Sequence, residues 1–300
     1  MPLSSVRTIA SDIKLAHSIF ALPFAVLAAF MAAASADGVI HWGTFGGQLV
    51  LIVVAMFFAR TAAMLANRLL DARLDAQNPR TASRAIPSGQ LSVAHARAAW
   101  MVVSFCFMVV CVLFGVFYGN WWPAVLGLPV LGWISLYSLT KRFTQFCHLW
   151  LGSSLALSPI AAAIAIDPAS LGSPSIWLLA VMVLFWVAGF DVIYALQDVE
   201  VDRRDGLHSM PGRLGVGPAL HAARIMHVIA VLALLGVAVT APRLGLVMLI
   251  ATAVVIGLLF YEHLTVSRWG TSRMALVFFT LNGVVSCLIG VAGVLDVTFG

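Results

Sequence analysis

Two short acidic segments contain the residues best suited to chemistry. The first runs from Asn67 to Asp75 and the second from Asp191 to Asp202. At about 100° per residue, each segment places its aspartates on one face of a helix. The residues that share these faces are Asn67, Asp71 and Asp75 in the first segment, and Asp191, Tyr194, Asp198 and Asp202 in the second. Like charges four residues apart repel each other on a helix, so both faces predict a bound cation.

The expected cation is Mg²⁺, with Mn²⁺ as an alternative. Carboxylates without a nearby His or Cys favour these hard ions over Zn²⁺. Because Mg²⁺ usually takes one or two carboxylates, several waters and substrate phosphate oxygens, the two segments together predict a metal-bridged diphosphate. The other interpretation is that the acids pair with neighbouring arginines at solvated helix ends, and the second copy of the motif makes it less favoured.

The composition places these segments in a membrane protein. The chain has 300 residues, of which 62% are hydrophobic and 10% are charged. Soluble domains are about 45–50% apolar and about 25% charged, so soluble, disordered, fibrous and disulfide-scaffold classes are excluded. The four cysteines show no CxxC spacing and are expected to stay reduced. What remains is an all-α polytopic membrane protein.

Apolar runs of about 20 residues predict nine transmembrane helices. Turn residues separate several of the runs, and the connections after the second and sixth runs are long and polar. The expected spans cover residues 15–35, 46–67, 95–117, 121–139, 147–166, 175–197, 220–240, 244–263 and 273–295.

Basic residues are distributed unequally on this topology. All Lys and Arg except Arg60 and Arg243 lie on one side, which an odd number of spans preserves. By the positive-inside rule, the N-terminus and the acidic segments face the cytoplasm and the C-terminus lies outside. We expect a bacterial inner membrane protein. The net charge of +5 is then explained by the excess of basic residues on the cytoplasmic side, and it does not indicate nucleic-acid binding.

The two acidic segments keep the same register, and each is followed by a basic loop with Pro and Gly. This weak repeat predicts one transmembrane domain over residues 1–300, with pseudo-repeat halves at about 14–140 and 141–265. Spans 1–4 and 5–8 would form two four-helix halves, and a ninth helix would complete a central cavity. Sites commonly lie where such halves meet.

These motifs resemble the UbiA superfamily of intramembrane prenyltransferases. The stretch DARLDAQNPRTASRAIPSG from Asp71 resembles the family's first conserved block, and KLAHSIFALPFA from Lys14 resembles the first helix of its 4-hydroxybenzoate polyprenyltransferase-like members. A third stretch is DVIYALQDVEVDRRDGLHS from Asp191. The last is most similar to quinone-pathway members, including menaquinone-type enzymes. One departure is Asn67-Arg68, where many members have Asn-Asp.

The resemblance implies transfer of a polyprenyl group from an isoprenyl diphosphate to an aromatic acid such as 4-hydroxybenzoate, in quinone biosynthesis. Prenylation of a dihydroxynaphthoate in menaquinone biosynthesis is the alternative. The implied metal ligands are Asp71, Asp75, Asp198 and Asp202. Ionisation would give an allylic carbocation, which the electron-rich ring attacks. The implied partners are the two substrates and membrane lipid, with no nucleic acid and no obligate protein partner.

Several further residues are assigned to the site, although a simpler interpretation exists for them as well. The residues expected to bind diphosphate are Asn67, Arg80, Arg84, Lys141, Arg142 and Tyr194. The four cations among them could instead only mark the cytoplasmic side. Arg60 lies inside an apolar span two turns before Asn67, so it needs an anionic partner, either the acceptor's carboxylate or a structural acid. Asp191 lies deeper than Asp198 and is expected either to take part in the site or to assist in removing a proton.

A secondary transporter is the competing class. Repeats and intramembrane charges fit a transporter, but both acidic segments lie at cytoplasmic helix ends. No matching polar residues line an outward path, which alternating access requires. A purely structural membrane subunit would leave the paired aspartates without a role.

Overall fold

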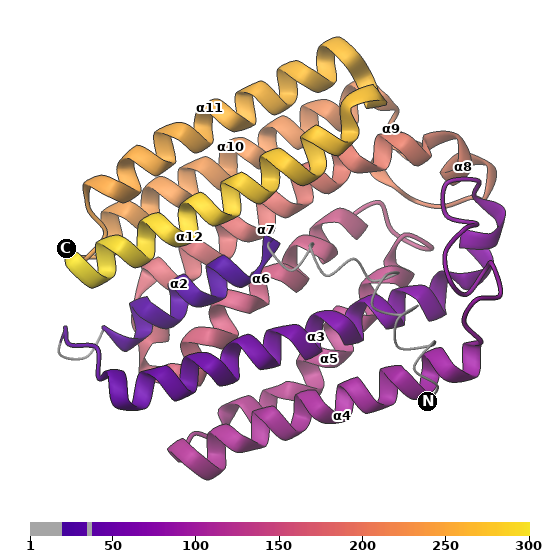
Figure 1. The fold of residues 1–300 in the computed structure, drawn as a ribbon. Coiled ribbons are helices and arrows are strands. Elements are labelled where there is room, and N and C mark those ends of the chain that lie inside the picture. Colours follow the sequence, from indigo (N-terminus) through magenta and orange to yellow (C-terminus); the bar gives the residue numbers. More distant parts are fainter. Residues whose placement is uncertain (1–19, 35–37) are drawn as a thin grey trace. The chain divides into compact units, whose positions relative to one another are not determined.

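The computed structural model describes residues 20–34 and 38–300, and within them every regular element is helical (Figure 1). This confirms the predicted all-α class. The α-helices are α2 (Leu22–Ala33), α3 (Trp42–Gln77), α4 (Val93–Tyr118), α5 (Trp122–Thr140), α6 (Cys147–Ile166), α7 (Pro174–Tyr194), α8 (Val199–Arg204), α9 (Met210–Leu214), α10 (Val216–Thr240), α11 (Leu246–Trp269) and α12 (Asn282–Phe299). The 3₁₀ turns are η2 (Pro168–Gly172), η3 (Ala195–Asp198) and η4 (Gly270–Arg273), and η5 (Ala275–Leu281) is a π-helix.

Eight helices in the described part of the chain are long and apolar enough to cross a membrane. The shorter α2 lies at the position of the expected first span, whose beginning, with Lys14, is outside the described residues. The second span was expected to end at residue 67, but α3 continues to Gln77. The first acidic segment is therefore the end of the same helix that crosses the membrane.

The chain forms two compact units. Among the described residues, the first unit is 54–140 and contains the later part of α3 with α4 and α5, where α4 packs on α5. Local signals set these helix ends, since the Ser92 hydroxyl accepts a hydrogen bond from the His95 N–H at the start of α4. Gly119 ends α4 with a φ of 70°, a left-handed conformation that favours glycine.

The second unit comprises residues 20–34, 38–53 and 141–300 of the described chain. Helix α7 lies at its centre, with α6 and α10 packed against it. Helix α2 packs on α6 and α12, and α11 packs on α12. The division of the chain into repeat halves stays a prediction.

Two glycines allow close approach to α7. A Cβ on Gly152 of α6 would lie 2.2 Å from the Leu184 carbonyl oxygen, and one on Gly189 would lie 2.3 Å from the His227 ring. Both distances are below any ordinary contact, so neither site accepts a larger residue without movement. The same close packing of α6 against α7 positions part of the candidate site.

The second acidic segment is not one continuous α-helix. Helix α7 ends at Tyr194, the 3₁₀ turn η3 follows, and α8 begins at Val199. A 3₁₀ turn advances about 120° per residue and rises about 2.0 Å, so the predicted common face from Asp191 to Asp202 is wrong as a regular helical stripe. The sequence pattern alone did not show this change of helix type.

Candidate active site

In the first unit, Asp71 and Asp75 occupy the last two turns of α3. Their exposed fractions are only 1% and 6%. Asn67 lies one turn earlier, and its Nδ2 donates to Asp71 Oδ2 at 3.1 Å and to Ser138 Oγ of α5 at 3.0 Å. The predicted helical face is therefore present here, with the amide of Asn67 hydrogen-bonded to the carboxylate that follows it.

Arg68 determines how Asn67 is oriented. Its guanidinium Nη1 donates to Asn67 Oδ1 at 2.7 Å, and the side chain of Arg68 is buried. Since a guanidinium can only donate, the amide oxygen faces Arg68 and the amide nitrogen is left to face Asp71. The arginine that departs from the family pattern thus supports the first acidic segment.

Asp75 is held by a residue from the loop after α3. Arg84 Nη1 donates to Asp75 Oδ1 at 2.7 Å and to Oδ2 at 2.8 Å. Thr81 Oγ1 donates to the Asp75 backbone carbonyl at 3.1 Å, which folds this loop back on the helix end. Arg80 is exposed, and its backbone N–H bonds to the Asn78 side chain. The alternative to the metal hypothesis was that the acids pair with neighbouring arginines. Asp75 does form such a pair, with Arg84.

Arg60 lies on α3 about two turns before Asn67, and it is partly buried. Within the part of the chain that the structure describes, no carboxylate forms an ion pair with Arg60. A cation at membrane depth without such a partner is costly. None of the described residues is a structural acid for Arg60, and its pairing with the acceptor's carboxylate stays a prediction.

In the second unit, Asp191 lies near the end of α7 against α6. His148 Nδ1 lies 2.7 Å from Asp191 Oδ2. The other ring nitrogen, Nε2, accepts a hydrogen bond from the Met210 backbone N–H at 3.2 Å. Because Nε2 accepts, the proton resides on Nδ1, and His148 donates it to Asp191. The imidazole, which is only 2% exposed, connects α6, α7 and the start of α9.

Asp202 is covered by the segment that follows it. The Ser209 hydroxyl donates to its carboxylate, and Ser209 also caps α9 by accepting the Gly212 N–H at 3.2 Å. A Cβ on Gly212 would lie 2.8 Å from Ser209 Oγ, so only glycine leaves this serine in place. The Leu207 N–H donates to the Asp202 carbonyl, which closes the turn.

The same segment contacts the start of the basic loop. The His208 N–H donates to the Lys141 carbonyl at 2.6 Å, which positions Lys141 within the second unit. Lys141 is partly buried and Arg142 is exposed. Asp198 is the N-cap residue of α8 and is partly exposed. The Tyr194 ring packs on Phe278, with 4.2 Å between centroids.

Each unit thus presents buried, hydrogen-bonded carboxylates and nearby cations. No group of three or more His, Cys, Asp or Glu side chains in residues 20–34 and 38–300 is arranged to hold a metal ion unaided. Such a donor set fits a hard divalent ion only if other oxygens, from water and phosphate, complete its shell. The four proposed metal ligands, Asp71, Asp75, Asp198 and Asp202, are all carboxylates, and such ligands suit Mg²⁺ better than Zn²⁺.

The sequence matches that of a known protein family. The model of the UbiA prenyltransferase family matches residues 21–293. The chain belongs to this family. The match includes every candidate site residue in both units, and the eight apolar helices together with this membership indicate an integral membrane protein.

Relatives of known name match about half of this UbiA family chain. It is 28% identical over 175 residues to a 4-hydroxybenzoate octaprenyltransferase from Marinomonas sp., a match covering 58% of each chain. It is 31% identical over 176 residues to one from Shewanella piezotolerans, covering 56% of this chain and 58% of that one. The matches thus span little more than half the length of these curated relatives.

Solved UbiA structures match nearly the whole chain. The apo structure of a UbiA homologue from Aeropyrum pernix K1 is 30% identical, with a TM-score of 0.80, and the match covers 93% of this chain and 98% of that chain. A homologue from Archaeoglobus fulgidus bound to DMAPP and Mg²⁺ is 18% identical, with a TM-score of 0.71, and the match covers 98% of this chain and 100% of that chain. The second likeness shows a shared fold.

Three residues that contact the candidate site residues were given no role from the sequence: Arg68, His148 and Ser209. His148 lies 43 residues before Asp191, and its neighbours in the sequence are apolar. The expectation that no His lies near the acids is therefore wrong, because α6 packs on α7. Ser209 could have been suspected as an N-cap residue, since Pro211 and Gly212 follow it.

Proposed function

We propose that this protein transfers a polyprenyl group from an isoprenyl diphosphate to an aromatic acid in quinone biosynthesis. The observation that carries the proposal is the pair of carboxylate sets, Asp71 with Asp75 and Asp198 with Asp202, in a chain of the UbiA family. Three of these four side chains are buried, and Asp198 is partly exposed. Charged groups in apolar helices are costly and are retained for function. Supporting it, named relatives are 4-hydroxybenzoate octaprenyltransferases and a neighbour binds DMAPP with Mg²⁺.

Both acidic segments would bind diphosphate. In this proposal Asp71, Asp75, Asp198 and Asp202 hold Mg²⁺, with Mn²⁺ as a substitute. When bound, the metal neutralises diphosphate charge. The remaining phosphate oxygens would be bound by cationic and hydrogen-bonding side chains. These side chains are Asn67, Arg80, Arg84, Lys141, Arg142 and Tyr194. Arg84 would then exchange part of its contact with Asp75 for phosphate.

The transfer itself follows from the substrates' chemistry. The allylic C–O bond breaks, and diphosphate leaves with the electron pair. The electron-rich ring carbon attacks the resulting carbocation, and loss of the proton from that carbon restores aromaticity. Asp191 would accept this proton, directly or through water, because His148 already holds one of its carboxylate oxygens in place. The apolar helices would shield the cation from water.

Arg60 would bind the carboxylate of the acceptor. It is a cation within an apolar helix, and an Arg fork matches a carboxylate in two parallel hydrogen bonds. A dihydroxynaphthoate acceptor, as in menaquinone biosynthesis, would present the same group. The unequal distribution of basic residues supports a bacterial inner membrane location with the N-terminus and site in the cytoplasm and the C-terminus outside.

A prenyl-transfer assay tests this proposal. Purified protein in lipid would be given geranyl diphosphate, Mg²⁺ and either 4-hydroxybenzoate or a dihydroxynaphthoate, with EDTA as the metal-free arm. We expect prenylated acid and released diphosphate only with metal, and no product from Asp71→Ala or Asp198→Ala. Glu200→Ala is the matched control, since Glu200 is an exposed acid on α8 and is not one of the proposed metal ligands. Full activity in both aspartate variants would contradict the metal assignment.

A further inference from the structure

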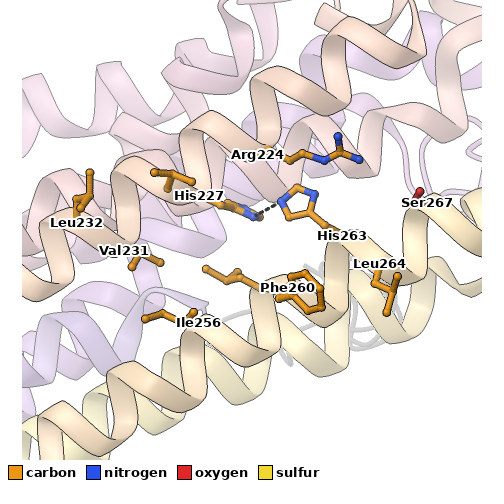
Figure 2. A pocket seen from close by; sticks show the side chains of 11 residues that line it. Arg224, His227, Val231, Leu232, Ile256, Phe260, His263, Leu264 and Ser267 are labelled. Atoms are coloured by element: carbon orange, nitrogen blue, oxygen red, sulfur yellow. Dashed lines mark hydrogen bonds between the residues drawn. The ribbon is translucent and has the colours of Figure 1, made fainter.

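A groove lies between α10 and α11 in the second unit. Its volume is ≈ 480 Å³, and Figure 2 shows the side chains that line it. One end is polar, with Arg224, His263 and Ser267. Towards the other end the lining is apolar, and Val231, Ile256 and Phe260 face the space. The proposed prenyl-transfer site uses none of these residues.

The polar end contains an unsatisfied hydrogen-bonding atom. His227 Nε2 lies 3.2 Å from the Trp186 carbonyl oxygen, and His227 Nδ1 lies 3.0 Å from His263 Nε2. A carbonyl only accepts, so His227 donates from Nε2, and its Nδ1 then accepts a proton from His263 Nε2. This order leaves His263 Nδ1 as an acceptor, and it is buried without a partner.

The groove has the length of one membrane leaflet. From Arg224 to Leu232, α10 rises about 12 Å, and from Ile256 to Ser267, α11 rises about 16 Å, at 1.5 Å per residue. Half of a hydrocarbon core is about 15 Å thick. The polar end also lies towards the basic termini of these helices, near Arg268. A ligand with one charged group and an apolar chain of leaflet length matches this shape.

Charge distinguishes between candidate ligands. Arg224 is the one full cation of the lining, and no lining residue is acidic. In residues 20–34 and 38–300, no carboxylate pairs with Arg224. One cation balances a phosphodiester monoanion, whereas a diphosphate carries more charge and generally recruits a metal held by carboxylates. A hydroxyl-bearing headgroup would in addition supply the donor that His263 Nδ1 lacks.

We propose that the groove between α10 and α11 binds one anionic phospholipid of the phosphatidylglycerol type. The phosphodiester pairs with Arg224, a headgroup hydroxyl donates to His263 Nδ1, and an acyl chain lies against Val231, Ile256 and Phe260. Basic pockets between transmembrane helices are suited to such headgroups. The bound lipid would fill the groove between the two helices.

Native mass spectrometry of the delipidated protein in detergent tests the proposal. Dioleoyl phosphatidylglycerol and dioleoyl phosphatidylcholine would be titrated separately. We expect one tightly bound phosphatidylglycerol, preferred about tenfold, and loss of that preference in Arg224→Gln, as for one charge-assisted hydrogen bond. Arg268→Gln is the matched control, because it removes an equal charge from the end of α11 outside the groove and should keep the preference.

A second variant separates the groove from surface charge. Val231→Phe fills the apolar part without altering charge, so it should lower occupancy by the lipid while Arg224 remains. Thermal unfolding midpoints would confirm that each variant is folded. Equal loss of preference in Arg224→Gln and Arg268→Gln would overturn the proposal in favour of diffuse attraction. Displacement of the lipid by equimolar geranyl diphosphate without metal would also overturn it, because the groove would then bind substrate.

Discussion

The Nδ1 atom of His148 lies 2.7 Å from Asp191 Oδ2, although the two residues are on different helices and 43 positions apart. The opposite ring nitrogen accepts the Met210 N–H, so the imidazole has one defined tautomer. A carboxylate held in this way has one oxygen occupied and one available. His148 is therefore a positioning residue for Asp191 in the proposed reaction.

Replacing His148 with Ala should lower kcat of the proposed transfer about 10- to 100-fold with little change in KM for prenyl diphosphate. The loss of two buried hydrogen bonds leaves Asp191 and the Met210 N–H unsatisfied. His148→Gln should recover part of kcat, because its amide can still donate to Asp191. Steady-state kinetics measure both values. Equal losses of kcat in the Gln and Ala variants would assign His148 a packing role alone.

Removal of Arg84 should destabilise the end of α3. Arg84→Gln leaves the buried Asp75 carboxylate without its cation, at a cost of about 1–2 kcal/mol, because Arg84 is itself 25% exposed. The thermal unfolding midpoint in detergent measures the loss. Arg97→Gln serves as the comparison, since Arg97 is exposed on α4. If Mg²⁺ with prenyl diphosphate restores the midpoint of the variant, Asp75 binds the metal complex.

The close packing around α7 should not tolerate a methyl group. Gly152→Ala and Gly189→Ala each place a Cβ within 2.3 Å of a neighbouring atom, and we expect a loss of about 1–3 kcal/mol. Gly257→Ala, with no atom within 4 Å of its added Cβ, should be neutral or stabilising by up to about 1 kcal/mol. Unfolding midpoints distinguish the sites. Equal midpoints for all three variants would contradict the close approach.

A buried polar cluster in the second unit should respond strongly to loss of Asn282. Its Oδ1 accepts from Trp186 Nε1 at 2.8 Å, and its Nδ2 donates to the Val277 carbonyl at 3.0 Å and to Glu262 Oε1 at 3.4 Å. Asn282→Leu would leave these groups without hydrogen-bond partners and lower the free energy of unfolding by about 2–4 kcal/mol.

Glu262→Gln is the matched variant for this cluster. Its amide keeps an acceptor for Asn282 and removes a carboxyl whose Oε2 has no hydrogen-bond partner. The unfolding midpoint of Glu262→Gln should equal or exceed that of the unaltered protein. A lower midpoint, close to that of Asn282→Leu, would show that the carboxyl group itself stabilises the fold.

Composition and local periodicity were sufficient to predict the class of the protein and its acidic motif on α3. Apolar runs of about 20 residues have few alternatives to membrane helices, because backbone groups in lipid must be bonded within the segment. Asn67, Asp71 and Asp75 share a helical face through local periodicity alone, and the structure shows the hydrogen bond between the first two.

The surroundings of those acids depend on how the helices pack together. The change to a 3₁₀ turn after Tyr194, the contact of His148 with Asp191 and the cover of Ser209 over Asp202 all depend on packing between α6, α7 and α9. The pairing of Asp75 with Arg84, and not with the exposed Arg80, depends on how one loop folds. Such contacts join residues distant in sequence, and helical periodicity contains no information about which helices become neighbours.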